Sequence, residues 1–136
     1  MGDRRWATSD SPFEGPIGFS RAIRAGDRVL VSGTGPVWPD GHCDPDVYAQ
    51  AMRAFKVAST ALSELDVALR DVVRTRMYLI DAGDWQAVGR AHNAYFEAVR
   101  PAATMVVVAG LLDPRWRVEV ELEAVAREKV ARRLVQ

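Results

Sequence analysis

Hydrophobic side chains recur at intervals of three and four residues in two segments of the chain, a pattern typical of amphipathic helices. The first stripe runs through residues 48–65 and follows Asp44 and Pro45, an acidic N-cap residue and a proline at the first helical position. The second stripe runs through residues 85–99, directly after Asp84. The sequence therefore predicts two helices, each with one apolar face.

Five other segments are predicted to be strands, of which residues 72–80 are dense in β-branched and aromatic residues. They are residues 19–25, 28–32, 72–80, 103–109 and 116–126. Gly26 and Asp27 separate the first two segments and indicate a tight hairpin. A helix between two strands favours a crossover connection, so part of the sheet is expected to be parallel.

This order of elements, β-β-α-β-α-β-β, predicts an α+β fold with a mixed sheet and both helices on one face. No repeat, linker or low-complexity tract divides the chain, so residues 1–136 are expected to form a single domain. Residues 1–15, rich in Ser, Pro, Asp and Gly, are interpreted as an irregular lead-in. Residues 128–136 are interpreted as a C-terminal tail.

Two of the predicted strands alternate so that each has an apolar face and a charged face. In the last strand the charged positions are Arg117, Glu119, Glu121 and Glu123. In strand 72–80 the parity sets Val73, Thr75, Met77 and Leu79 opposite Val72, Arg74, Arg76 and Tyr78. Burying unpaired charge is costly. The charged face is therefore either solvated, with ion pairs between strands, or an interface between copies of the chain.

Composition narrows the partners that can be expected. The 18 Lys and Arg residues balance 18 Asp and Glu residues, so no excess of positive charge favours nucleic acid, and none is expected as a partner. No apolar stretch approaches the ~20 residues that span a bilayer, and no secretory signal is apparent, so no membrane partner is expected. The single cysteine, Cys43, fits a reducing cytoplasm, which is the expected location.

Few residues suggest metal or nucleophilic chemistry. His42 and Cys43 are adjacent, but a zinc site usually needs three or four ligands, so no metal is expected. Ser32 has no sequence sign of a catalytic triad. His92 lies on the apolar stripe of the second helix and is interpreted as a core or subunit-contact histidine.

A series of short stretches resembles the Rid family, the reactive intermediate deaminases also called YjgF-like proteins. The stretches are Pro16–Ser20, Val31–Gly33 with Pro36, Leu69–Thr75, Tyr78–Asp81, Phe96, Arg100–Ala102 and Val120–Ala126. Together they cover residues 15–127. The resemblance implies two helices on one face of a sheet and a homotrimer similar in architecture to chorismate mutase, with three clefts between subunits.

Deaminase-type members of the family hydrolyse reactive enamines and imines, such as 2-aminoacrylate, without a metal or organic cofactor, so no cofactor is expected. The resemblance places the family's water-positioning glutamate at Glu121. It places the arginine that grips the substrate carboxylate at Ala103, which has no donor. The chain is therefore interpreted as a divergent Rid protein to which 2-aminoacrylate deamination does not carry over.

Other cleft positions also depart from the family pattern. Met105 stands where cysteine is frequent, and Phe19 keeps the aromatic ring without a hydroxyl. Arg76 and Arg117 either point into the cleft, in place of the missing arginine, or pair with glutamates across the sheet. The resemblance implies Glu121 as the catalytic residue and a small-molecule ligand in contact with Phe19, Ser32, Gly33, Arg76, Ala103, Thr104 and Met105.

Two functions follow from this pattern. The first is an enzyme that hydrolyses a small imine, enamine or related reactive metabolite, or transfers a proton on it, in a cleft between subunits. The alternative is a non-catalytic trimeric module that binds a small molecule or a protein. An RNA-cleaving role, proposed for some relatives, is disfavoured by the absence of net positive charge.

Overall fold

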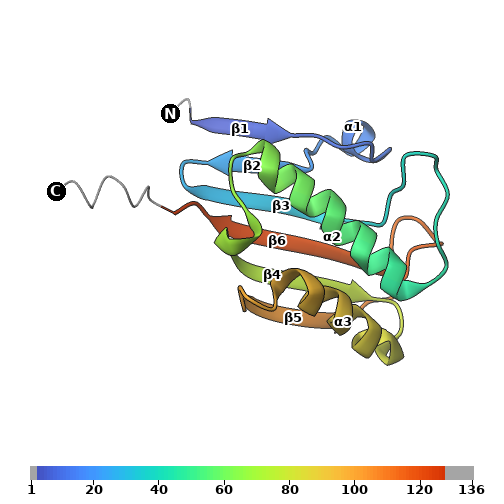
Figure 1. The fold of residues 1–136 in the computed structure, drawn as a ribbon. Helices are drawn as coiled ribbons and strands as arrows, with labels where there is room; N and C mark the ends of the chain where they lie inside the picture. Colours follow the sequence, from blue (N-terminus) through green and yellow to red (C-terminus); the bar gives the residue numbers. More distant parts are fainter. Residues whose placement is uncertain (1–2, 128–136) are drawn as a thin grey trace.

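A computed structural model of the protein describes residues 3–127, which form one six-stranded mixed sheet with two long helices on one face (Figure 1). The strands are β1 (Arg4–Ala7), β2 (Ala22–Ala25), β3 (Arg28–Thr34), β4 (Val72–Leu79), β5 (Ala102–Val107) and β6 (Val118–Val125). The helices are α1 (Glu14–Ile17), α2 (Val47–Glu64) and α3 (Trp85–Phe96), with 3-10 turns η1 (Leu69–Asp71) and η2 (Ala82–Asp84).

The sheet order is β1-β2-β3-β6-β4-β5, in which β4 and β5 are parallel and all other neighbours are antiparallel. Helix α3 connects the two parallel strands, as the crossover argument predicted. The Gly26-Asp27 hairpin between β2 and β3 is also present, with Gly26 at a φ of 64°. The predicted α+β fold with a mixed sheet is confirmed.

The long helices begin where side chains or neighbouring turns satisfy free backbone N–H groups. Asp46 caps α2, because its carboxylate accepts a hydrogen bond of 2.9 Å from the Ala49 N–H. The prediction that Asp44 caps this helix is wrong by two residues: the Asp44 carboxylate accepts from the Asp46 N–H in the preceding loop. Helix α3 begins after Asp84, as predicted, but the Asp84 side chain does not cap it.

The N-terminal lead-in is more ordered than the sequence predicts. The interpretation of residues 1–15 as irregular is wrong for Arg4–Ala7, which pair with β2 as strand β1, and for the start of α1. Only Ala7 of this strand is buried, so no alternation marks it in the sequence. An ion pair of 2.7 Å between Arg5 and Asp66 ties the strand to the end of α2. The predicted tail, residues 128–136, lies outside the described residues.

The core lies between the sheet and the two long helices. Phe55 of α2 and Phe96 of α3 are fully buried and meet edge to face, with ring centroids 5.6 Å apart. Their apolar faces pack on Val118, Val120 and Leu122 of β6, which are at most 1% exposed. Burial of this kind supplies most of the stability of a helix-on-sheet layer, because apolar area leaves water.

One predicted side-chain parity is wrong. Val73 was expected to share the apolar face of its strand with Thr75, but it is 49% exposed, and Val72 is buried instead. The pairing of β4 with β6 shifts register between Val72 and Arg74. This irregularity reverses the direction of the first residues of the strand, as a β-bulge does.

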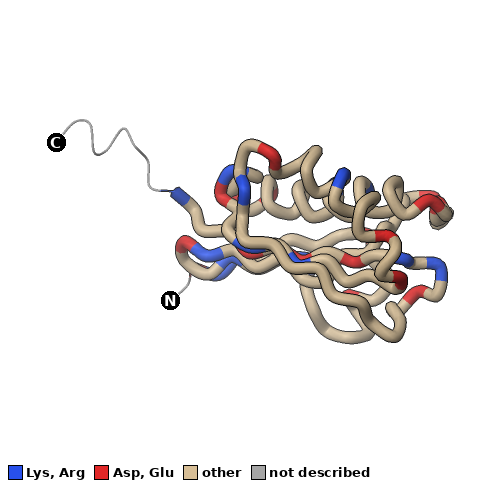
Figure 2. Tube along the Cα trace, turned by 90° about the horizontal axis from the view of Figure 1, so that it is seen from below, with Lys and Arg blue, Asp and Glu red and all other residues tan. Residues whose placement is uncertain are grey.

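The sheet face opposite α2 and α3 is called the open face here. Figure 2 views the sheet edge-on, with the helices on one side and charged residues running along the strands. The two edges of the sheet differ. Edge strand β1 begins with Arg4 and Arg5, whereas edge strand β5 contains no charged residue.

Candidate functional site

Charged side chains of β6 and β4 lie together on the open face. The register in which the two strands pair sets opposite charges next to each other. Arg76 lies opposite Glu121, and Arg74 lies opposite Glu123. The Arg76 Nη1 atom is 3.6 Å from Glu123 Oε2, and the Arg74 Nε atom is 3.5 Å from the same oxygen. Such partly exposed pairs contribute little to stability, but they fix the direction of the side chains.

Glu121 contacts two side chains of β4 through a single oxygen. The Tyr78 hydroxyl, on β4, donates a hydrogen bond to Oε1 of Glu121, and the Arg76 Nη1 atom lies 3.8 Å from the same oxygen. The hydrogen bond to Glu121 raises the pKa of Tyr78, so its hydroxyl stays a donor. Among residues 3–127, no donor or cation contacts Oε2 of Glu121, which leaves that oxygen free to accept a proton or hold water.

Glu119 is a second carboxylate on the open face that the sequence did not single out. Its side chain lies directly over Gly33 of β3, where an added Cβ would overlap the carboxylate. Burial raises the pKa of Glu119, and the nearby Glu121 raises it further, while Arg21 opposes the shift. A carboxyl group in this position takes up a proton more readily than an ordinary glutamate.

Arg21 is buried beside this site and was also missed. Its Nη1 atom donates to the Gly33 carbonyl and to Thr34 Oγ1, at 2.9 Å for the latter. Its Nε atom is 3.4 Å from Glu14 of α1, which is also buried. The only sequence signal for this pairing is the presence of an acidic and a basic residue in the N-terminal segment, and buried ion pairs cannot be told from exposed ones at that level.

The residues predicted to line the ligand cleft fall on both faces of the sheet. Thr104 lies opposite Arg76 and so shares the open face with Glu121. Ala103 lies opposite Thr75, whose hydroxyl contacts His92 of α3, so Ala103 points to the helix side of the edge strand. Within one chain, Ala103 and Glu121 therefore point to opposite faces.

Met105 also lies on the helix side, opposite Met77, and its terminal methyl group approaches Gly89 of α3. The Ser32 hydroxyl donates a hydrogen bond of 2.7 Å to the Ser20 carbonyl. The Phe19 ring lies 5.3 Å from the Arg21 guanidinium carbon, a cation–π contact. The chain by itself thus splits the predicted cleft residues into separate groups.

Arg117 takes no part in the open-face cluster, although its position in the strand suggested that it could. Its guanidinium binds Asp84 at the start of α3, at 2.7 and 2.9 Å. Both hydrogen bonds come from the Nη2 atom, and they join the start of β6 to the helix layer. Of the two arginines predicted to replace the family arginine or pair with glutamates, Arg76 pairs with Glu121 and Glu123.

His92 packs in the helix layer, with its ring centroid 4.8 Å from that of Phe96. Burial lowers the pKa of His92, so the neutral ring is favoured there. Within residues 3–127, no three His, Cys, Asp or Glu side chains come together as metal ligands. The helices in the same range are too short or too polar to cross a membrane.

Comparison with known proteins agrees with this fold. Residues 12–126 match the family described as Endoribonuclease L-PSP. The uncharacterized protein SCO2049 of Streptomyces coelicolor is 45% identical over 123 residues, which cover 88% of this chain and 90% of that protein. The 2-iminobutanoate/2-iminopropanoate deaminase of Escherichia coli K12 is 30% identical over 125 residues, which cover 88% of this chain and 94% of the deaminase.

Solved structures show the same likeness. Rv2704 of Mycobacterium tuberculosis, a member of the YjgF/YER057c/UK114 family, has a TM-score of 0.83 and 37% identity, over 90% of this chain and 99% of that one. The YjgF gene product of Escherichia coli has a TM-score of 0.77 and 26% identity, over 90% of this chain and 94% of that one. The chain therefore belongs to the endoribonuclease L-PSP family, the Rid or YjgF family that its sequence resembles.

Proposed function

We propose that the protein is an enzyme that hydrolyses a small imine or enamine without a cofactor, with Glu121 as its acid–base residue. The observation that carries this proposal is the state of the Glu121 carboxylate. One oxygen is fixed by the Tyr78 hydroxyl and Arg76, and the other has no partner among the described residues. A relative named as an imine deaminase supports the same reaction class.

The reaction needs a water molecule and two rounds of proton transfer. In the first, oxygen from water adds to the imine carbon, Glu121 takes the proton that the water loses and passes it to nitrogen, and a carbinolamine forms. In the second, Glu121 takes the proton of the carbinolamine hydroxyl and passes it to nitrogen as the C–N bond breaks and the C=O bond forms. The products are one carbonyl compound and one ammonia, which balance the imine and the water consumed. An enamine first takes a proton on carbon to become the imine.

The active site is proposed to form between copies of the chain in a homotrimer. Glu121 and the Ala103–Met105 side of β5 point to different faces of one sheet. They can line one cleft only if different copies supply them, which supports the family's inter-subunit arrangement. Light scattering is expected to give about three times the chain mass of 15.0 kDa; a stable monomer at micromolar concentration would contradict the proposal.

The substrate is proposed to be less polar than 2-aminoacrylate. Ala103 offers no donor for a carboxylate, and Met105 makes the same wall apolar. A missing charge-assisted contact costs about 1.5–3 kcal/mol, which is roughly 10- to 150-fold in affinity. Arg76 is the cation nearest to Glu121, but Glu121 and Glu123 already occupy it.

The test is hydrolysis of a panel of imines, generated in place by amino-acid and amine oxidases and followed by ammonia release. Wild type should accelerate at least one member, and Glu121→Gln should lower kcat by about 100-fold or more, because general acid–base catalysis contributes that much. Glu97→Gln, at the exposed end of α3, is the matched control and should retain full activity. Equal rates for wild type, Glu121→Gln and buffer would contradict an enzymatic role.

The second candidate is a non-catalytic trimer that binds a small molecule or protein, and the absence of an arginine at Ala103 favours it. Thermal denaturation separates the two functions, because a ligand that binds only the native state raises its stability. A compound from the same panel that raises the melting temperature without being converted would support this binding role.

A further inference from the structure

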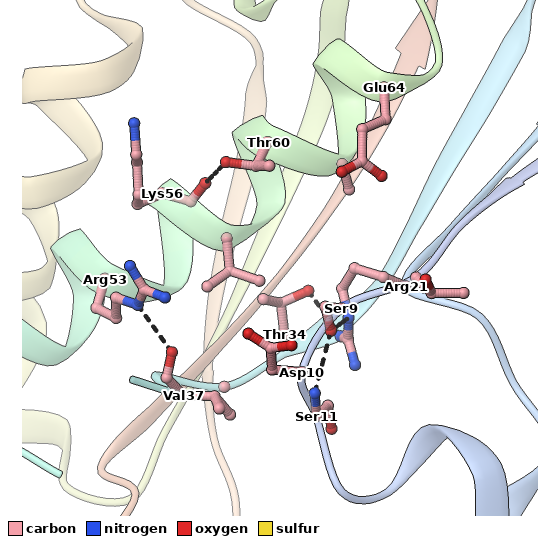
Figure 3. A pocket seen from close by; sticks show the side chains of 14 residues that line it. Ser9, Asp10, Ser11, Arg21, Thr34, Val37, Arg53, Lys56, Thr60 and Glu64 are labelled. Carbon is pink, nitrogen blue, oxygen red and sulfur yellow. Dashed lines mark hydrogen bonds between the residues drawn. The ribbon is translucent and has the colours of Figure 1, made fainter. Parts of the chain in front are cut away.

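A pocket of about 260 Å³ lies on the helix side of the sheet; Glu119, Glu121 and Glu123 do not line it, although Arg21, which lies near Glu119, does. It is enclosed by the N-terminal segment 8–11, the end of β3 and one side of α2 (Figure 3). The pocket has room for several water molecules, each of which occupies about 30 Å³. Nothing in the proposed imine chemistry uses it.

The pocket holds charges of both signs that do not pair with each other. Arg53 and Lys56 of α2 line it, together with Asp10 and Glu64. Among the described residues, none of these four forms an ion pair. Arg53 faces the cavity together with Asp10 and Glu64, whereas the Lys56 ammonium group points away from them (Figure 3). Arg21 also lines the pocket, but it already pairs with Glu14. A ligand that complements Arg53 and the carboxylates therefore carries both a negative and a positive charge.

The cation at one end is positioned in advance. The Arg53 Nε atom donates a hydrogen bond of 2.8 Å to the Val37 carbonyl, which fixes the plane of the guanidinium. Within residues 3–127, its terminal nitrogens have no hydrogen-bond acceptor. Figure 3 shows Arg53 at one end of the pocket and Glu64 at the other, with Asp10 below the helix between them. A carboxylate on Arg53 would place an attached ammonium group toward the Asp10 side.

The rest of the lining is apolar or carries hydroxyl groups. Val37, Val57 and Ala61 form the apolar part. The buried Arg21 side chain also lines the pocket, and the hydroxyl groups come from Thr8, Ser9, Ser11, Thr34 and Thr60. An apolar group of a few carbons can lie against the valine and alanine side chains, where it gains by leaving water.

We infer that this pocket binds a free α-amino acid with an apolar side chain, its carboxylate on Arg53 and its ammonium group on Asp10. The site is separate from the proposed active site, and its occupancy is independent of whether imines are hydrolysed. It gives the protein a means of sensing the class of compound from which oxidases and lyases produce imines.

The probe is L-leucine, compared with its two truncated forms, 4-methylpentanoate, which lacks the ammonium group, and 3-methylbutylamine, which lacks the carboxylate. Amide NMR of the ¹⁵N-labelled protein is expected to show saturable shifts at residues 8–11 and 53–64 with leucine. Each truncated form should bind roughly tenfold or more weakly, because it loses one charge-assisted contact.

Charge-removing variants assign each contact. Asp10→Asn should lower the affinity for leucine by roughly tenfold and leave the affinity for 4-methylpentanoate unchanged. Arg53→Gln should lower the affinity for both of these compounds and leave the affinity for 3-methylbutylamine unchanged. The matched controls Asp27→Asn and Arg70→Gln change exposed charges outside the pocket and should bind as wild type does. Leucine binding no tighter than either truncated form, or shifts confined to the open face, would overturn the inference.

Discussion

At the scale of single residues, the arrangement of the open face depends on close contacts that no local sequence pattern predicts. Glu119 sits over a glycine, and Glu121 is held by a tyrosine on the next strand. Gly33 has an ordinary backbone conformation, so it is required here for space and not for a special dihedral angle. The identity of one small residue thus fixes where a carboxylate lies.

Replacing Gly33 by alanine should displace the Glu119 carboxylate and destabilise the protein by about 1–3 kcal/mol, because the added methyl group overlaps the carboxylate. Urea unfolding measures the change. In the background of Glu119→Ala, Gly33→Ala should cost much less free energy of unfolding than it does in wild type, because no carboxylate is left to overlap the new methyl group. Gly110→Ala adds a methyl group to open space and is the control. Additive losses in the double variant would contradict the overlap.

The raised pKa of Glu119 predicts how stability varies with pH. Below the ordinary glutamate pKa of about 4.3, both folded and unfolded states are protonated at this group and it has no effect. As pH rises through the window up to the raised folded pKa, the unfolded state loses its proton first, so wild type loses stability. Glu119→Gln should remove this loss, so in urea unfolding its stability relative to wild type should increase as pH rises from about 4.3. The increase should end once the raised folded pKa is passed. A pH-independent difference would contradict the shift.

At the scale of elements, alternation and amphipathic periodicity predicted the two long helices and strand β6 well, because each depends on a run of many residues. Strand β1 and the irregular start of β4 could not be predicted, since one is too short to alternate and the other depends on its partner's register. The alternation of residues along β4 and β6 predicted that Tyr78 and Glu121 lie on the charged face. The burial of Arg21 could not be predicted in this way, because it depends on an ion pair with Glu14 of another segment.

The start of α2 provides a test at this scale. Asp46→Ala should destabilise the protein by about 1 kcal/mol, because it removes the acceptor for the Ala49 N–H. Asp44→Ala, two residues earlier, should cost less, because Asp44 only orders the loop before the helix. Thermal or urea unfolding distinguishes them. A larger loss for Asp44→Ala would place the helix start where the sequence alone predicted it.

At the scale of the whole molecule, the sheet presents two unlike edges. Strand β1 carries two arginines at one edge, and β5 is uncharged at the other. If neighbouring copies cover β5 in the proposed homotrimer, only the β1 edges stay outside, and their guanidinium groups repel a further chain. Assembly is therefore expected to close into finite particles, and a concentrated solution should keep a constant scattering radius where a protein with two bare edges would lengthen into fibrils.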